Sequence, residues 1–150
     1  MKRNSANYRE SDCFLVPLRS GGFARGVVAR LSGDGIVFGY FFGPKIATSE
    51  SACLKTMPTP ADAVLCGQFG DLGLLNSQWK IFSQIKPWRE DEWPLPPFIR
   101  ANAPVVSIYD DNLRFIREQE VEVNSASAKL PKDSVMGYGF VELRLTKLVV

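Results

Sequence analysis

The sequence predicts a mainly-β protein, with a small curled antiparallel sheet that is barrel-like or sandwich-like and at most one or two short helices. Short apolar runs recur along the chain, and several of them place alternate residues on one face. Glycine-containing turns separate many of these runs at short spacing. No apolar pattern continues long enough to predict a helix of more than about two turns.

A three-stranded meander is predicted at the N-terminal end of the chain. Its strands cover residues 12–19, 23–31 and 36–42. Gly21 and Gly22 mark the first turn, because glycine adopts the positive φ that tight hairpin turns need. Pro17 lacks an N–H, so the first strand is expected to lie at an edge or to bulge there. The third strand is apolar on both faces and is expected to be buried.

The remaining strands are predicted over residues 63–69, 79–85, 105–109, 113–116, 121–123 and 141–145. The last of them has the clearest alternation, and its odd-numbered residues are expected to face inward. A short helix is predicted near residues 48–54 and a single helical turn near residues 71–76. Residues 125–133 are expected to form a mobile loop.

Length and composition predict one soluble domain. The chain has 150 residues, enough for a full hydrophobic core, and we expect a single domain over residues 1–150 with a loose tail at residues 1–10. The formal net charge is +2, and the scattered basic residues of the N-terminal third are predicted to be solvated. These residues are Lys2, Arg3, Arg9, Arg19, Arg25, Arg30 and Lys45. The N-terminus has no apolar stretch typical of a signal peptide, so we predict a cytoplasmic protein without a membrane partner.

The sequence lacks the residues of the commonest catalytic and cofactor sites. It contains no histidine, which removes the commonest general base and leaves Cys66 without an imidazole to activate its thiol. The glycines of residues 67–73 lack the spacing of a dinucleotide-binding motif. Acidic groups at residues 90–92 and 110–111 offer oxygen ligands for a divalent cation, but are expected to be only solvated. We therefore predict no catalytic residue, no cofactor and no metal site.

A proline-rich segment over residues 86–98 is predicted to be a structured loop. It contains Trp88 and Trp93, and its prolines forbid a continuing helix or a central strand. With Trp79 and Phe98, these rings would offer a platform on which the bases of single-stranded nucleic acid stack. The charges between Trp88 and Trp93 are mostly acidic and repel phosphate, so nucleic acid is not the expected partner and packing onto the sheet is the expected role.

Two blocks of sequence carry a family resemblance. In residues 12–28, an aspartate precedes an apolar strand that ends in Pro-Leu, and a turn leads to a strand of the form aromatic-x-x-Gly-x-Val. Residues 64–98 contain a second hairpin and a proline-rich close that follows a tryptophan. Together the blocks resemble the immunity protein 26 family, small bacterial proteins associated with polymorphic-toxin loci. The chain departs from the family pattern at Ser11 and Gln78, where glycine is usual, and residues 99–150 match only loosely.

The resemblance implies a non-enzymatic protein that neutralises a cognate toxin domain by binding it in the cytoplasm of the producing cell. It supplies no binding residues. From the residues themselves, we predict that partner binding involves Trp88 and Trp93 together with Glu90, Asp91 and Glu92, since aromatic and acidic residues alternate in a loop that prolines hold rigid. Double alanine substitution of the two tryptophans is expected to weaken the complex and leave the fold intact.

Two other functions remain open on the sequence. A β-barrel module that binds nucleic acid or a peptide would fit the short strands and the basic N-terminal third, and it predicts salt-dependent binding of oligonucleotides. An enzyme that uses only carboxylates predicts an activity that depends on Asp110 or Asp111.

Overall fold

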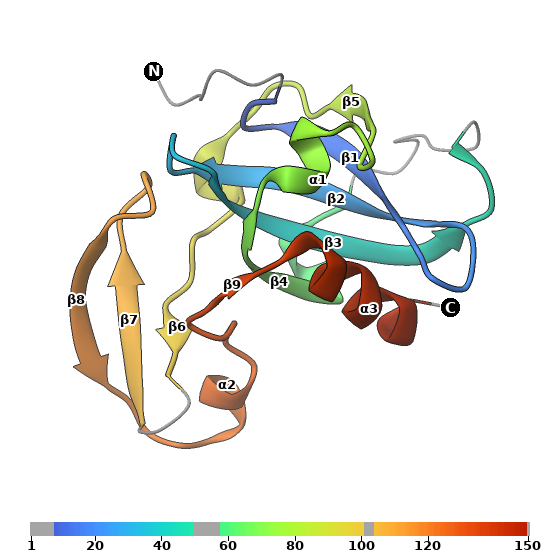
Figure 1. Ribbon diagram of the computed structural model, residues 1–150. Coiled ribbons are helices and arrows are strands. Elements are labelled where there is room, and N and C mark those ends of the chain that lie inside the picture. Colours follow the sequence, from blue (N-terminus) through green and yellow to red (C-terminus); the bar gives the residue numbers. More distant parts are fainter. Residues whose placement is uncertain (1–7, 50–57, 101–103, 150) are drawn as a thin grey trace.

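The structure is a computed structural model, and it describes residues 8–49, 58–100 and 104–149. The described residues form two β-sheets and three α-helices (Figure 1). The strands are β1 (Asp12–Pro17), β2 (Phe23–Leu31), β3 (Ile36–Ile46), β4 (Leu65–Gly70), β5 (Ile81–Gln84), β6 (Phe98–Ile99), β7 (Val105–Tyr109), β8 (Phe115–Glu120) and β9 (Val135–Met136). The helices are α1 (Leu72–Leu75), α2 (Ser125–Ala128), α3 (Tyr138–Leu148) and the short 3₁₀ helices Pro60–Asp62 and Glu90–Glu92.

The larger sheet has the strand order β5-β1-β2-β3-β4-β9 and is antiparallel except for the pair β4–β9. Strands β1 to β4 are successive neighbours, which confirms the predicted meander. Gly21 and Gly22 have φ values of +95° and +77° in the first turn, as their role there requires. β1 is not an edge strand, but its ladder with β5 covers only Asp12 to Phe14, so Pro17 lies beyond that ladder.

β6, β7 and β8 form a smaller antiparallel sheet beside one end of the larger one (Figure 1). The rings of Phe38 in β3 and Phe98 in β6 pack edge-on with centroids 5.7 Å apart, so the two sheets meet through aromatic side chains. The mainly-β class is confirmed. Neither sheet closes on itself, however, so the barrel-like form is wrong, and the described residues contain three α-helices instead of one or two.

Both faces of the larger sheet are covered. On one face, α1 and α3 pack over residues that include Phe14 and Phe41. On the opposite face, the proline-rich loop and β6 pack over residues that include Phe38 and Tyr40. β3 is therefore buried on both faces, as its uninterrupted apolar run predicted.

Gly26 of β2 leaves room for an aromatic ring from the neighbouring strand. A Cβ atom at this position would lie 2.4 Å from Cζ of Phe14, whose buried ring stacks on Trp79 with centroids 5.5 Å apart. We expect Gly26→Ala to lower the free energy of unfolding by about 2 kcal/mol, because the added methyl group displaces that ring. Gly70→Ala is the control, since nothing lies within 4 Å of its Cβ position. Equal urea midpoints for the two variants would contradict this account.

The strand predicted over residues 141–145 is wrong, because these residues lie in α3. Val141, Leu145 and Val149 are buried against the larger sheet at the four-residue spacing of one helix face. Leu143, expected to face inward, is 47% exposed. The stretch alternates in hydrophobicity, but its leucine, glutamate and arginine residues are also good helix formers, and the sheet offers a face on which a helix packs.

Two further differences lie just before α3. The strand predicted over residues 121–123 is not formed, because β8 ends at Glu120. The stretch expected to be a mobile loop begins with α2, whose first turn is capped by the Asn124 side chain accepting a hydrogen bond from the Ser127 N–H.

The N-terminal tail is ordered where its described residues begin. Tyr8 is buried, and its hydroxyl donates a 2.6 Å hydrogen bond to a carboxylate oxygen of Asp71. Within the tail predicted over residues 1–10, Tyr8 therefore contacts the folded part of the chain. Most of the helix predicted near residues 48–54 lies outside the described residues. None of the helices within the described ranges is long and apolar enough to cross a membrane.

Candidate partner-binding surface

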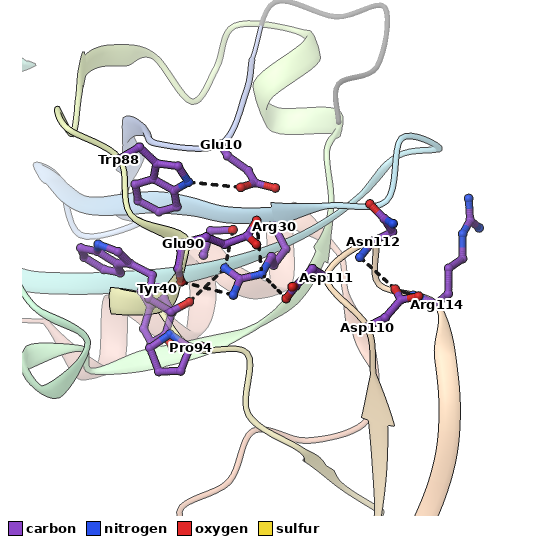
Figure 2. Close-up of polar contacts among 12 residues, drawn as sticks. Glu10, Arg30, Tyr40, Trp88, Glu90, Pro94, Asp110, Asp111, Asn112 and Arg114 are labelled. Carbon is purple, nitrogen blue, oxygen red and sulfur yellow. Dashed lines mark hydrogen bonds and ion pairs between the residues drawn. The ribbon is translucent and has the colours of Figure 1, made fainter. Parts of the chain in front are cut away.

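The proline-rich loop runs from β5 to β6 across one face of the larger sheet, and Trp93 anchors it there. The Trp93 ring is 4% exposed and packs edge-on against Tyr40 of β3 with centroids 5.4 Å apart. The Tyr40 hydroxyl donates a hydrogen bond to the carbonyl of Pro94 (Figure 2). Burial raises the pKa of Tyr40, so the hydroxyl keeps its proton at neutral pH and remains a donor.

Trp88 covers this anchor from outside. Its ring stacks on Trp93 with centroids 5.9 Å apart and 24° between the planes. Its Nε1–H donates a 3.1 Å hydrogen bond to Oε1 of Glu10, and the side chain is half-buried. On sequence alone the two tryptophans have the same expected role, but their burial in the structure differs. Trp93 is buried beneath the loop, whereas Trp88 is half-buried.

Arg30 joins the loop to the sheet from below. A shift in register between Val28 and Arg30 in β2 is a β-bulge, and it turns the arginine toward the loop. The Arg30 side chain is 4% exposed. Its Nη1 donates to the carbonyl oxygens of Ala29 and Trp93, at 2.8 and 2.9 Å. The prediction that Arg30 is solvated is therefore wrong, and its position inside an apolar run was the available sign of burial.

The same guanidinium brings together two acidic groups that lie far apart in the sequence (Figure 2). Nε of Arg30 donates to Oδ1 of Asp111 at 2.9 Å, in the turn between β7 and β8. Oε2 of Glu90, in the proline-rich loop, lies 3.8 Å from the same Nε, and Nη2 donates to the Glu90 carbonyl at 3.4 Å. A planar guanidinium suits this position, because it presents several donors in fixed directions.

The turn between β7 and β8 is itself well ordered. Oδ1 of Asp110 accepts hydrogen bonds from the backbone N–H groups of Asn112 and Arg114, at 2.8 and 3.0 Å. Nη1 of Arg114 lies 3.3 Å from Oδ2 of Asp34, in the turn between β2 and β3. The hydrogen bond from Ser32 and the charge of Arg114 lower the pKa of Asp34. These contacts hold Asp111 in place beside Arg30.

The result is a charged surface over a buried cation, which we call the acidic surface. It consists of Glu90, Asp91, Glu92, Asp110 and Asp111. Asp91 and Glu92 are exposed at the tip of the loop. Within the described ranges, no three acidic or cysteine side chains converge as ligands of a metal ion would. The arrangement is suited to cationic side chains of another macromolecule.

The structure also tests the nucleic-acid and catalytic hypotheses. Trp79, Trp93 and Phe98 are buried, so the base-stacking role considered for them is wrong. Burial raises the pKa of the Cys66 thiol to about 11, so the thiol stays protonated and is a poor nucleophile at neutral pH. The Asp110 carboxylate, a candidate for carboxylate catalysis, is engaged in shaping its turn.

The two sequence blocks of the family resemblance lie mainly in the core. The rings of Phe14 and Trp79 stack under α1 and α3, and Gly26 leaves room for the Phe14 ring. The carboxylate of Asp12 is buried and accepts hydrogen bonds from the Arg9 N–H and the Gln84 side chain, both at 2.9 Å. Because these residues pack in the core, the two sequence blocks specify the fold. The proline-rich loop is the part of the second block that reaches the surface.

The fold and this loop define a small mainly-β protein with an ordered, charged surface of the kind that binds another macromolecule. Over residues 9–104 the chain matches the family model described as immunity protein 26, and it belongs to this family. Membership confirms the resemblance and indicates that the protein neutralises a toxin. Comparisons with curated proteins and with solved structures give no match. The matched residues include the proline-rich loop and end before the turn that contains Asp111.

Proposed function

We propose that this protein neutralises a cognate toxin domain by binding it directly, without catalysis, in the cytoplasm of the bacterium that produces both. The acidic surface supports the proposal, because Asp91 and Glu92 project from a loop that Arg30 and Trp93 hold against the sheet. A surface ordered before binding loses little conformational entropy when a partner docks. The exposed carboxylates favour a toxin surface that carries lysine and arginine.

The two tryptophans of the proline-rich loop, Trp88 and Trp93, have different proposed roles. Trp88 is the aromatic contact, because it is only half-buried and belongs to the same loop as Glu90 and Asp91. Trp93 is a positioning residue that keeps the loop in its bound shape from beneath. Loss of binding in a variant that lacks both rings would therefore combine a lost contact with a lost anchor, so single substitution of Trp88 is the cleaner change.

Calorimetric titration with the C-terminal domain of the protein encoded immediately upstream tests the proposal. We expect a one-to-one complex with a Kd of about 10 nM or tighter. Charge reversal of the loop tip, Asp91→Lys with Glu92→Lys, is expected to weaken binding by about 30-fold, largely through slower association. Trp88→Ala should weaken it by about 10-fold, as expected for an aromatic interface contact.

Glu120→Lys with Glu122→Lys is the matched control, because these exposed acids lie at and just beyond the end of β8. We expect this control to change the affinity by about twofold at most. Equal effects of the two charge reversals would remove the acidic surface as the interface. Absence of binding to a folded toxin domain would remove the proposed function itself.

A further inference from the structure

A second charged surface lies along the outer side of β5. There the structure contains an open groove of about 730 Å³, lined by residues of β5 and by Leu74 of α1. Three exposed cations line it: Arg9, Lys80 and Lys86. The carboxylate that shares this lining, Asp12, is 3% exposed and already accepts two hydrogen bonds. The groove therefore presents net positive charge, although the neighbouring loop is acidic.

The groove also follows the edge of a sheet. β5 is the outermost strand on this side of the larger sheet among the described residues. Ser83 and Gln84 of β5 line the groove, and the half-buried Ile81 contributes apolar surface. The outer edge of a strand offers backbone donors and acceptors to an added extended segment. Phe82 has no partner in the ladder between β5 and β1, so β5 is irregular at this residue. The irregularity limits backbone pairing with an added segment to a few residues, so the three cations are expected to contribute more of the binding affinity.

We propose that this groove binds an extended, acidic segment of the toxin domain, which adds to the edge of β5 between Lys80 and Lys86. The proposal rests on the proposed function, because it assigns a second contact to the same partner. Charge complementarity selects an acidic segment. The edge strand favours a polypeptide over nucleic acid, and the adjoining acidic surface would repel a phosphate backbone.

The groove and the acidic surface are neighbours in the structure. Lys86 stands at the start of the proline-rich loop, and Arg9 precedes Glu10, whose carboxylate accepts the hydrogen bond from Trp88. A partner that spans both surfaces would need basic residues opposite the loop and acidic residues opposite the groove. Such a two-signed pattern fixes the orientation of docking and rejects partners that carry a single sign of charge.

The first test uses charge reversal in the groove. Lys80→Glu with Lys86→Glu is expected to weaken binding of the upstream-encoded toxin domain by about 10-fold or more. The matched control is Lys129→Glu with Lys147→Glu, two exposed lysines outside the groove, with an expected change of about twofold at most. If the toxin binds and both pairs leave its affinity unchanged, the groove proposal is overturned while the proposed function stands.

The second test does not use the toxin. A short blocked peptide of alternating threonine and glutamate is titrated into the ¹⁵N-labelled protein, and we expect amide shifts concentrated at Ile81–Gln84. The threonine–lysine counterpart and a single-stranded oligonucleotide should leave these amides unchanged. Shifts caused equally by the lysine peptide, or by the oligonucleotide in place of the acidic peptide, would overturn the proposal. Failure of the toxin to bind at all would overturn the proposed function instead, and with it the toxin as the occupant.

Discussion

Replacing Trp79 by alanine is expected to lower the free energy of unfolding by about 4 kcal/mol, the largest stability effect among the substitutions considered. The Trp79 side chain is 1% exposed and stacks on Phe14 with 4° between the ring planes. It also contacts the ring of Phe69, with centroids 5.4 Å apart. Alanine would leave a cavity beside rings that belong to different strands, β1 and β4, and such a site cannot collapse without moving the strands.

Trp79 also carries a polar link between the sheet and α3. Its Nε1–H donates a 2.9 Å hydrogen bond to Oε2 of Glu142, a buried carboxylate whose other oxygen accepts from Arg19 at 3.2 Å. Trp79→Phe keeps an aromatic ring but leaves Oε2 without this donor, and we expect a loss of about 2 kcal/mol. The hydrogen bonds from Trp79 and Arg19 therefore explain how the charged Glu142 side chain is accommodated on the inner face of α3.

Urea denaturation monitored by circular dichroism measures both substitutions. Trp88→Ala is the comparison, since this half-buried ring lies at the surface and its loss should cost about 1 kcal/mol. If Trp79→Ala and Trp88→Ala unfold at the same urea concentration, Trp79 does not organise the core as described. If Trp79→Phe is as stable as the natural chain, the bond to Glu142 contributes nothing measurable.

The parts of the fold that the sequence predicted correctly are those decided by local geometry. The first hairpin follows from Gly21 and Gly22, whose positive φ is a property of the residues themselves. The burial of β3 follows from an apolar run that offers no polar face to water. α3 was missed because Val141 to Leu145 satisfies a two-residue and a four-residue period at once, and the choice depends on the surface available to cover it.

The candidate site shows the same division. Its acidic residues are neighbours in sequence, so the loop group at Glu90 and the turn group at Asp111 were visible separately. Their convergence was not visible, because it depends on Arg30, which lies 60 and 81 residues away from them along the chain. The different roles of Trp88 and Trp93 likewise depend on which ring lies against Tyr40, a contact made across distant parts of the chain.

Arg30→Met is expected to lower the free energy of unfolding by about 2 kcal/mol and to loosen the acidic surface. The substitution removes the donor that reaches the carbonyl oxygens of Ala29 and Trp93, and these lie in a region from which water is largely excluded. Asp111 would lose its 2.9 Å partner, but its side chain is 58% exposed and regains water. The cost therefore falls on the buried backbone of the loop more than on the ion pair.

The loop should respond locally before the molecule unfolds. We expect faster amide hydrogen exchange in Arg30→Met at Glu92 and Trp93, whose N–H groups donate within the short helical turn at the loop tip. Affinity for the toxin domain should fall by about 10-fold under conditions where the variant is folded, because the acids are present but no longer held in place. Arg30→Lys keeps the charge without the planar fork and should recover only part of this loss.

Arg114→Met is the control for Arg30→Met, because it also removes an arginine near the acidic surface but not the buried one. The ion pair between Arg114 and Asp34 is exposed on both sides, so its loss should cost less than about 1 kcal/mol and leave exchange in the loop unchanged. If Arg30→Met matches Arg114→Met in stability, loop exchange and toxin affinity, the buried guanidinium does not organise the surface. If loop exchange rises while affinity stays unchanged, the loop is ordered by Arg30 as described, but the toxin binds elsewhere on the protein.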